Sequence, residues 1–181
     1  MTYVLNNYII PGKETYESID VPEHDGTFED YITERIHQYR GLTEKELCKK
    51  FGINYESKPK NLGAMIAYRI LGIRGNKAEE FVKANVVLKT IRVEQNSTIK
   101  ESMSFPHFKF KELVEETWDD STFGSYLEET RFLFVVFKRQ ENGELQLRGC
   151  QFWNMPYDIL QSDIKAVWER TVTVLNKGLI I

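Results

Sequence analysis

Val86-Val87-Leu88-Lys89-Thr90-Ile91-Arg92-Val93 is the stretch around which the rest of the chain is organised. Its β-branched residues predict a buried strand of a sheet. Two cations, Lys89 and Arg92, lie within this stretch, and a cation on a core strand costs desolvation free energy unless it has a partner or a task. The alternative is an edge strand whose Lys and Arg reach solvent along their aliphatic stems. Lys89 is therefore the residue to explain first.

Length and composition indicate one globular unit. The chain has 181 residues, of which 41% are hydrophobic and 13% aromatic, enough to fill a core. We expect a single domain over residues 1–181, with an irregular N-terminal lead-in over residues 1–26. An apolar run at residues 178–181 follows the last predicted helix directly, which predicts that the fold is C-terminally truncated and continues beyond residue 181.

The apolar runs and the two cysteines indicate the cellular compartment in which the protein is found. No apolar run approaches the roughly 20 residues that a membrane span needs, and the N-terminus lacks the regions of a signal peptide. The sequence therefore predicts a cytoplasmic protein with no membrane partner. Cys48 and Cys150 lack the spacing of metal ligands, so we expect both to be small, reduced core residues.

Hydrophobic periodicity predicts a mixture of helices and strands. Thr27 and Thr43 each begin a capping box, and Asn142-Gly143 is typical of a tight hairpin turn. The expected helices are residues 28–39, 44–51, 62–71, 110–117 and 156–175, and the expected further strands are residues 98–105, 131–137 and 145–152.

The charge of the chain is unevenly distributed. The net charge is −3, but residues 58–100 hold nine Lys or Arg against three acids, a surplus of six positive charges, so the other residues carry −9. A local basic surface on an acidic protein can bind phosphates, because affinity for nucleic acid comes from neutralised phosphates and not from overall charge. The alternative is an ordinary solvated surface.

A polar loop precedes the helix predicted at residues 62–71. Lys58 and Lys60 flank Pro59 in this loop, and Asn61 follows directly before the helix. Two cations beside a helix N-terminus can grip a phosphate with their side chains and with free backbone N–H groups. A solvated loop is the alternative interpretation.

A Lys on a strand in a basic region is typical of metal-dependent phosphodiester hydrolysis. In that reaction carboxylates hold Mg²⁺, the metal activates water, and a nearby Lys stabilises charge that develops on the phosphate. Such nucleases carry a Glu-x-Lys motif, because the period of two in a strand places Glu and Lys on the same face. In this chain the position two residues before Lys89 is Val87.

The chain resembles the MutH-type endonucleases, a family that includes GATC-cleaving type II restriction enzymes of staphylococci. The resemblance runs from about Leu42 to the end of the last predicted helix. It is carried by residues 41–47, 63–72 and 85–93 and by the hairpin with its following helix. The strand is its specific part, because the family's strand has the same Leu-Lys-Thr-Ile. The resemblance implies an α+β fold, a mixed central sheet flanked by helices, of the PD-(D/E)xK restriction-endonuclease type.

The resemblance also implies that most of the family's active site is missing. The metal-binding Asp of the family falls on Glu80, and the Glu of Glu-x-Lys falls on Val87. A further acid of the family falls on Ala67 or Tyr68, and an additional Lys falls within residues 127–130, where no Lys occurs. Lys89 alone is unchanged. One carboxylate and one Lys do not make a competent Mg²⁺ site, so we expect no metal or cofactor in this domain.

The resemblance implies a DNA-binding, regulatory or dimerising domain of a GATC-specific type II restriction endonuclease. Such a domain is a second, C-terminal copy of the fold. Mg²⁺ then belongs to the full-length enzyme, and the expected partners are double-stranded DNA, a catalytic MutH-like domain of the same polypeptide and, on DNA, a second copy. We expect phosphate contacts on one face of the domain from Lys58, Lys60, Asn61, Lys89 and Arg92. The family's base-reading loop would lie beyond Ile181.

Two other functions fit the same sequence. The first is an active Mg²⁺-dependent endonuclease that recruits Glu80, Glu101 and a further acid in place of the missing Glu. The second is a protein-interaction domain without DNA binding. Metal-dependent cleavage separates the first from the regulatory domain, and salt-dependent DNA binding separates the second.

Overall fold

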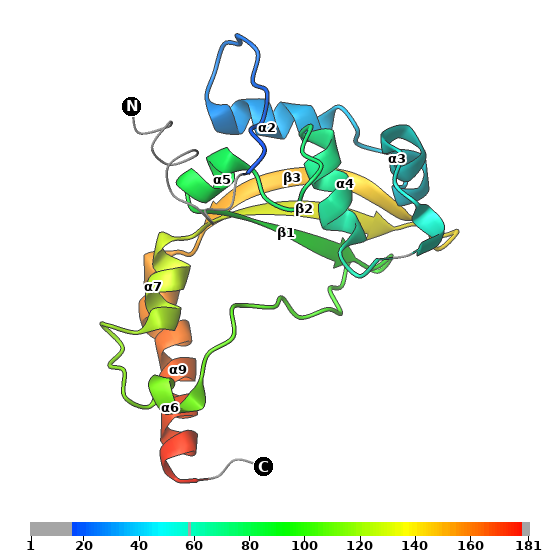
Figure 1. Ribbon diagram of the computed structural model, residues 1–181. Helices are drawn as coiled ribbons and strands as arrows, with labels where there is room; N and C mark the ends of the chain where they lie inside the picture. Colours follow the sequence, from blue (N-terminus) through cyan, green and yellow to red (C-terminus); the bar gives the residue numbers. More distant parts are fainter. Residues whose placement is uncertain (1–15, 58, 179–181) are drawn as a thin grey trace.

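A computed structural model describes residues 16–57 and 59–178 of the chain. Its centre is a three-stranded sheet in the order β1-β2-β3. The strands are β1 (Val86–Val93), β2 (Arg131–Arg139) and β3 (Leu145–Asn154). β1 is parallel to β2, and β3 is antiparallel to β2, so the sheet is mixed (Figure 1). The predicted α+β class and the predicted hairpin are confirmed.

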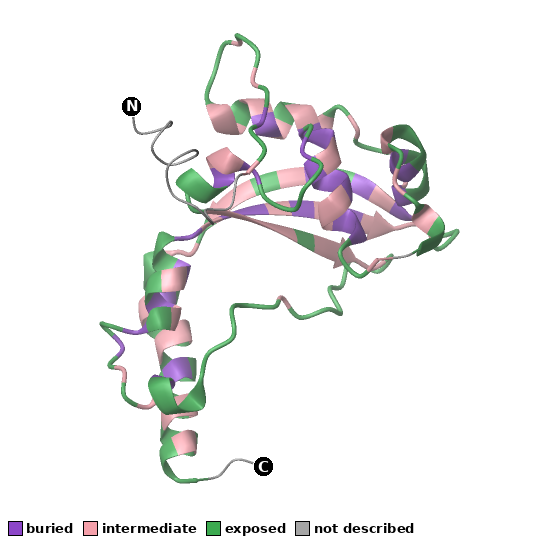
Figure 2. Cartoon of the chain, viewed as in Figure 1, coloured by how far each residue is buried: buried purple, intermediate pink, exposed green. Residues whose placement is uncertain are grey.

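β1 lies at an edge of this sheet. Within the described residues only β2 forms a ladder with β1, and all residues of β1 are half-buried except the exposed Thr90 (Figure 2). The prediction of a buried strand is therefore wrong, and the edge strand is correct. An edge strand tolerates Lys89 and Arg92 because their charged ends can leave the apolar layer.

The strand predicted at residues 98–105 does not form. One isolated antiparallel bridge joins Val93 to Ile99, and residues 100–109 are irregular. We call residues 94–109 the crossing segment, because they run from the end of β1 back towards the helices beyond (Figure 1). Its polar groups bind side chains of the sheet instead of a neighbouring strand, as shown below.

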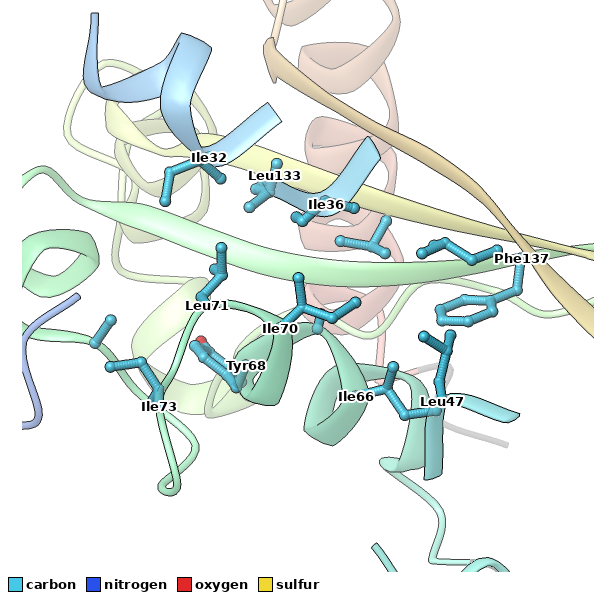
Figure 3. Close-up of a cluster of buried hydrophobic side chains, with 14 of the residues drawn as sticks. Ile32, Ile36, Leu47, Ile66, Tyr68, Ile70, Leu71, Ile73, Leu133 and Phe137 are labelled. Atoms are coloured by element: carbon cyan, nitrogen blue, oxygen red, sulfur yellow. The ribbon is translucent and has the colours of Figure 1, made fainter. Parts of the chain in front are cut away.

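Helices α2 (Phe28–His37), α3 (Glu44–Phe51) and α4 (Leu62–Ile70) cover one face of the sheet (Figure 1). Both predicted capping boxes are present, at Thr27 and Thr43. The short helix η2 (Tyr55–Ser57) lies between α3 and α4, and α5 (Glu79–Lys83) precedes β1. The buried side chains between these helices and the sheet form the main core (Figure 3), which includes Ile32, Ile36, Leu47, Ile66, Ile70, Leu133 and Phe137.

A second group of helices forms an arm that extends from one end of the sheet (Figure 1). It consists of α6 (Phe110–Leu113), α7 (Thr122–Glu129) and a long helix after Pro156, made of α8 (Tyr157–Ile159), the π-helical η3 (Leu160–Ile164) and α9 (Lys165–Asn176). Helix α6 is shorter than predicted, because only one turn forms before Val114. A second core joins the arm to the sheet and contains Leu113, Trp118, Leu127, Phe132, Leu160 and Trp168.

The two cores identify the two faces of the sheet. On β1, Val86 and Leu88 pack against the main core, whereas Val87 packs against the second core. Side chains alternate along a strand, so Lys89 shares the face of Val87, and Arg92 shares the face of Leu88 and Thr90. We call the face of Leu88 the helix face and the face of Val87 the open face.

Two further predictions concern the described residues. Cys48 is buried, Cys150 is half-buried, and both are free thiols, as expected. No helix in the described part of the chain is long and apolar enough to cross a membrane.

Candidate functional site

Lys89 projects from the open face of β1 and binds the crossing segment. Its partner across the ladder is Phe134 of β2, and its Nζ donates a 2.6 Å hydrogen bond to the carbonyl oxygen of Ser104. Burial lowers the pKa of the Lys89 ammonium group, because the charged form loses water. The cation predicted to need a partner therefore has one, and that partner is backbone.

Val87 lies two residues before Lys89 on the same face, the position at which a Glu-x-Lys motif would place its carboxylate. Its ladder partner is Phe132, and it packs against the second core. The apolar side chain of Val87 therefore packs on aromatic rings of the second core. It supplies neither charge nor oxygen to a cation near Lys89.

Glu80 lies on α5, and its carboxylate has a structural partner. The Oε2 atom of Glu80 accepts a 3.0 Å hydrogen bond from the backbone N–H of Ile19. This contact ties the chain before α2 to α5, next to the parallel bridge between Glu17 and Ala78. Glu80 therefore holds the segment before α2 in place. None of the contacts observed for the described residues joins it to Lys89.

The two candidates for the third acid position lie in the main core. Ala67 and Tyr68 of α4 are buried, and burial raises the pKa of the Tyr68 phenol. Tyr68 stacks at a tilt on Phe81, with 6.3 Å between the ring centroids. An alanine methyl group and a neutral phenol do not supply the carboxylate oxygen that a hard cation prefers.

A pocket of about 380 Å³ opens beside the first half of β1. Tyr68 and Val87, two of the positions compared above, line it together with Asn76, Lys77, Asn85 and apolar neighbours. None of the described residues that line this pocket is an acid.

The described residues of this region do not supply the ligands that a divalent cation needs. Mg²⁺ is bound by carboxylate and carbonyl oxygens and by water in near-octahedral geometry. No three His, Cys, Asp or Glu side chains gather in a group able to hold a metal ion, in residues 16–57 and 59–178. With Val87 apolar and Glu80 bound to backbone, the donor set does not fit Mg²⁺.

Arg92 lies on the helix face, opposite Lys89. Its Nη1 forms a 3.2 Å ion pair with Oε1 of Glu101, in the crossing segment. The expectation that Lys89 and Arg92 share one face does not hold, because they are three residues apart in a strand of period two. The spacing of three residues in the sequence already predicts opposite faces.

Lys60 and Asn61 lie where α4 begins, near the end of β1 (Figure 1). Both are exposed, and Asn61 makes no side-chain cap to the helix. Helix α4 approaches β1 closely here, since a Cβ built on Gly63 would lie 3.1 Å from Cγ2 of Thr90. The helix start therefore lies on the helix face of β1, the face that carries Arg92. Lys58 lies outside the described residues.

Two cations of β2 were not among the predicted site residues. Lys138 lies beside Val93 in the ladder, and Arg139 forms a 3.0 Å ion pair from its Nε to Oε2 of Glu94. They lie at the end of the strand parallel to β1, so their backbone is next to that of Arg92 and Val93. The parallel ladder pairs residues that are about 45 positions apart in the sequence. Only the register of the sheet therefore shows that Lys138 and Arg139 lie near Arg92. The signal available in the sequence was Lys138-Arg139 at the end of a confident strand.

The chain is similar in sequence to a known restriction enzyme. No protein-family model matches the chain. The type II restriction enzyme Sau3AI of Staphylococcus aureus is 34% identical over 197 residues, an alignment that includes 98% of this chain. The chain spans 39% of the length of that enzyme. Nearly the whole chain is thus similar to a part of Sau3AI, a type II restriction enzyme, and its mixed sheet with flanking helices is the α+β fold of a restriction-endonuclease-like domain.

Proposed function

We propose that this chain is a DNA-binding, catalytically degenerate domain of a type II restriction endonuclease. Its task is to hold GATC-containing double-stranded DNA and thereby to regulate or dimerise the enzyme. The similarity to Sau3AI supports the link to restriction. The observation that carries the non-catalytic role is Val87, an apolar residue on the same strand face as Lys89 and two residues before it.

The proposal assigns cleavage to another domain. Removing a carboxylate ligand takes away both charge and geometry, and a hydrated Mg²⁺ tolerates neither loss. In the proposal Mg²⁺ acts in the full-length enzyme, on a catalytic MutH-like domain of the same polypeptide. A second copy of the enzyme on DNA is a further proposed partner, and the proposed location is the cytoplasm, where such an enzyme meets its DNA.

The proposal assigns DNA contacts to the cations around the end of β1. Lys60 and Asn61 lie at the start of α4, and Arg92 lies on the same face of β1. A phosphate near this helix start would meet side-chain cations and the positive end of the helix dipole together. The proposal includes Lys58 of the same loop and Lys89 on the open face.

Salt-dependent binding to duplex DNA tests the proposal. Each phosphate contact that is lost should reduce the slope of log K against log salt by about 0.9. We expect the double change Lys58→Ala with Lys60→Ala to reduce the slope by roughly two, and to weaken binding equally on GATC and scrambled duplexes, because phosphate contacts do not read bases.

Lys177→Ala is a matched control. Lys177 is exposed and lies just after α9, at the far end of the arm (Figure 1), so its removal should leave the slope unchanged. No binding of the unmutated chain at low salt, or an unchanged slope in the double variant, would instead favour the protein-interaction domain. Mg²⁺-dependent cleavage that disappears in Glu80→Ala would favour the active nuclease.

A further inference from the structure

Two lysines on the open face bind the crossing segment. Lys89 of β1 donates to the carbonyl oxygen of Ser104 at 2.6 Å. Lys138 of β2 donates to the side-chain hydroxyl of Ser97 at 3.2 Å. Both acceptors are uncharged oxygens, so these contacts leave the positive charge of each lysine without a counter-charge from these partners.

Two arginines on the helix face bind the same segment through carboxylates. Arg92 pairs with Glu101 at 3.2 Å, and Arg139 pairs with Glu94 at 3.0 Å. The side chain of Glu101 is 63% exposed, so water and salt reach the Arg92 pair freely. Exposed ion pairs of this kind contribute little to stability and are weakened further by salt.

The four cations thus share one partner, the crossing segment. Arg92, Lys138 and Arg139 lie at the ends of two adjacent parallel strands, and Lys89 lies in the middle of β1. The segment has little other support along this part of its course. Its ladder contact is the single bridge between Val93 and Ile99, and Phe105 packs edge-on against Phe123 and Tyr126 of α7, with ring centroids 5.8 and 6.4 Å apart. Residues 95–102 are exposed throughout.

We propose that residues 94–105 are an internal occupant of a phosphate-binding surface formed by Lys89, Arg92, Lys138 and Arg139, and that duplex DNA displaces this occupant. The inference rests on the proposed DNA-binding function and extends it to two cations of β2 and to a competing segment. The carboxylates, hydroxyl and carbonyl of the segment accept the hydrogen bonds that phosphate oxygens would accept.

The exchange is favourable for a physical reason. DNA releases condensed counterions for each phosphate that a cation neutralises. Arg92 loses little free energy when it leaves the exposed carboxylate of Glu101, whereas Arg139 leaves the half-buried carboxylate of Glu94. β1 and β2 are parallel, so their final residues lie side by side. A DNA backbone that crosses these strand ends can contact Lys138 on one face of the sheet and the arginines on the other. Lys89 lies on the same face as Lys138, four residues before the end of β1.

Affinity measurements on charge-neutral variants test the competition. Glu101→Gln frees Arg92 without removing a cation, and we expect it to tighten duplex binding about two- to fivefold at low salt, the range that an exposed ion pair would contribute. The gain should vanish when Arg92→Ala is added, because no cation remains to be freed.

Glu115→Gln is the matched control. It makes the same change in net charge at an exposed position of the arm, six residues after the crossing segment, and the cations at the strand ends pair with Glu101 and Glu94 instead. A general electrostatic effect would strengthen binding in Glu115→Gln and Glu101→Gln equally. A gain confined to Glu101→Gln, and lost in the double variant, supports the competition.

Hydrogen exchange of the complete chain provides a second readout. Duplex DNA should increase amide exchange at Glu94, Ser97 and Thr98, whose N–H groups donate hydrogen bonds within the segment, while it protects the end of β1. If the unmutated chain binds no duplex at low salt, the DNA-binding function itself fails. If it binds DNA but exchange at Glu94, Ser97 and Thr98 is unchanged or slower, and Glu101→Gln behaves as Glu115→Gln, the DNA-binding function stands and the internal occupant is wrong.

Discussion

Val87, Lys89 and Glu80 have the packing and hydrogen bonds of structural residues. Val87 contacts the second core, Lys89 binds the carbonyl oxygen of Ser104, and Glu80 accepts the backbone N–H of Ile19. None of these contacts brings two carboxylates together. A single reversion therefore cannot rebuild a metal site, because the missing oxygens would have to come from several elements at once.

Val87→Glu should leave the chain unable to cleave DNA with Mg²⁺ or Mn²⁺. It should also lower the free energy of unfolding by about 1–3 kcal/mol, because a carboxylate would replace a methyl-bearing side chain that packs on aromatic rings. Plasmid nicking and urea denaturation measure the two effects. Cleavage by the single variant would overturn our assignment of the site.

The two cysteines should react slowly with a thiol reagent in the native state. Burial raises the pKa of Cys150 to about 11, and burial also raises the pKa of Cys48, so little thiolate exists near pH 8. Both should react quickly once the chain is unfolded in denaturant. Rapid modification of the native protein, or zinc found by elemental analysis, would contradict this expectation.

At the scale of elements, the first turn of α3 contains two acids in opposite environments. The Glu44 carboxylate is buried, its Oε1 atom has no hydrogen-bond partner, and desolvation raises its pKa. Glu46 completes the capping box, and the backbone N–H and hydroxyl of Thr43 lower its pKa. The same helix start thus holds one carboxylate that folding disfavours and one that folding favours.

Glu44→Gln and Glu46→Gln should therefore change stability in opposite directions at pH 7. The folded pKa of Glu44 is raised, so its ionised form destabilises the fold above that pKa, and the Gln variant should be more stable there. The folded pKa of Glu46 is lowered, so its contribution is present above the unfolded pKa near 4.5 and is lost as pH falls through the folded value.

Both differences should disappear once the pH lies below the lowered folded pKa of Glu46, because each carboxyl is then protonated in the folded and unfolded states. Urea denaturation across the acidic and neutral range measures the sign of each. Equal changes of the same sign in the two variants would show that the environments are not opposed.

At the scale of the whole molecule, two cores lie on opposite faces of one sheet. The residues that stabilise the fold are therefore largely distinct from the residues proposed to bind DNA. The main core fixes α2, α3 and α4 on the helix face, and the second core fixes the arm. Most candidate phosphate contacts lie at the ends of β1 and β2 and at the start of α4. Lys89 is the exception, because its ladder partner Phe134 packs against the second core. Stability of the arm and affinity for DNA should thus be separable.

Trp168→Ala should lower the free energy of unfolding by about 3 kcal/mol without changing the salt slope of DNA binding. Trp168 is buried against Trp118, with ring centroids 5.8 Å apart, and none of the cations at the strand ends contacts it. Val167→Ala, at a neighbouring position that is 62% exposed, should change stability by less than about 0.5 kcal/mol. A lower salt slope of DNA binding in Trp168→Ala would show that the arm contributes to the DNA-binding surface.

The sequence alone determined the local features of this protein, because short-range chemistry decides them. Thr27 and Thr43 specify capping boxes, Asn142-Gly143 specifies the hairpin, and Pro156 marks the start of the long helix. The similarity to a type II restriction enzyme was also readable in the sequence, and it extends over 98% of the chain.

The tertiary structure alone decided which cations meet. Long-range pairing makes β1 an edge strand, places Lys138 and Arg139 beside its end, and directs the polar residues of the crossing segment to four cations instead of to a further strand. Periodicity within residues 98–105 could not reveal this outcome. Whether an alternating segment becomes a strand depends on the partners offered by distant parts of the chain.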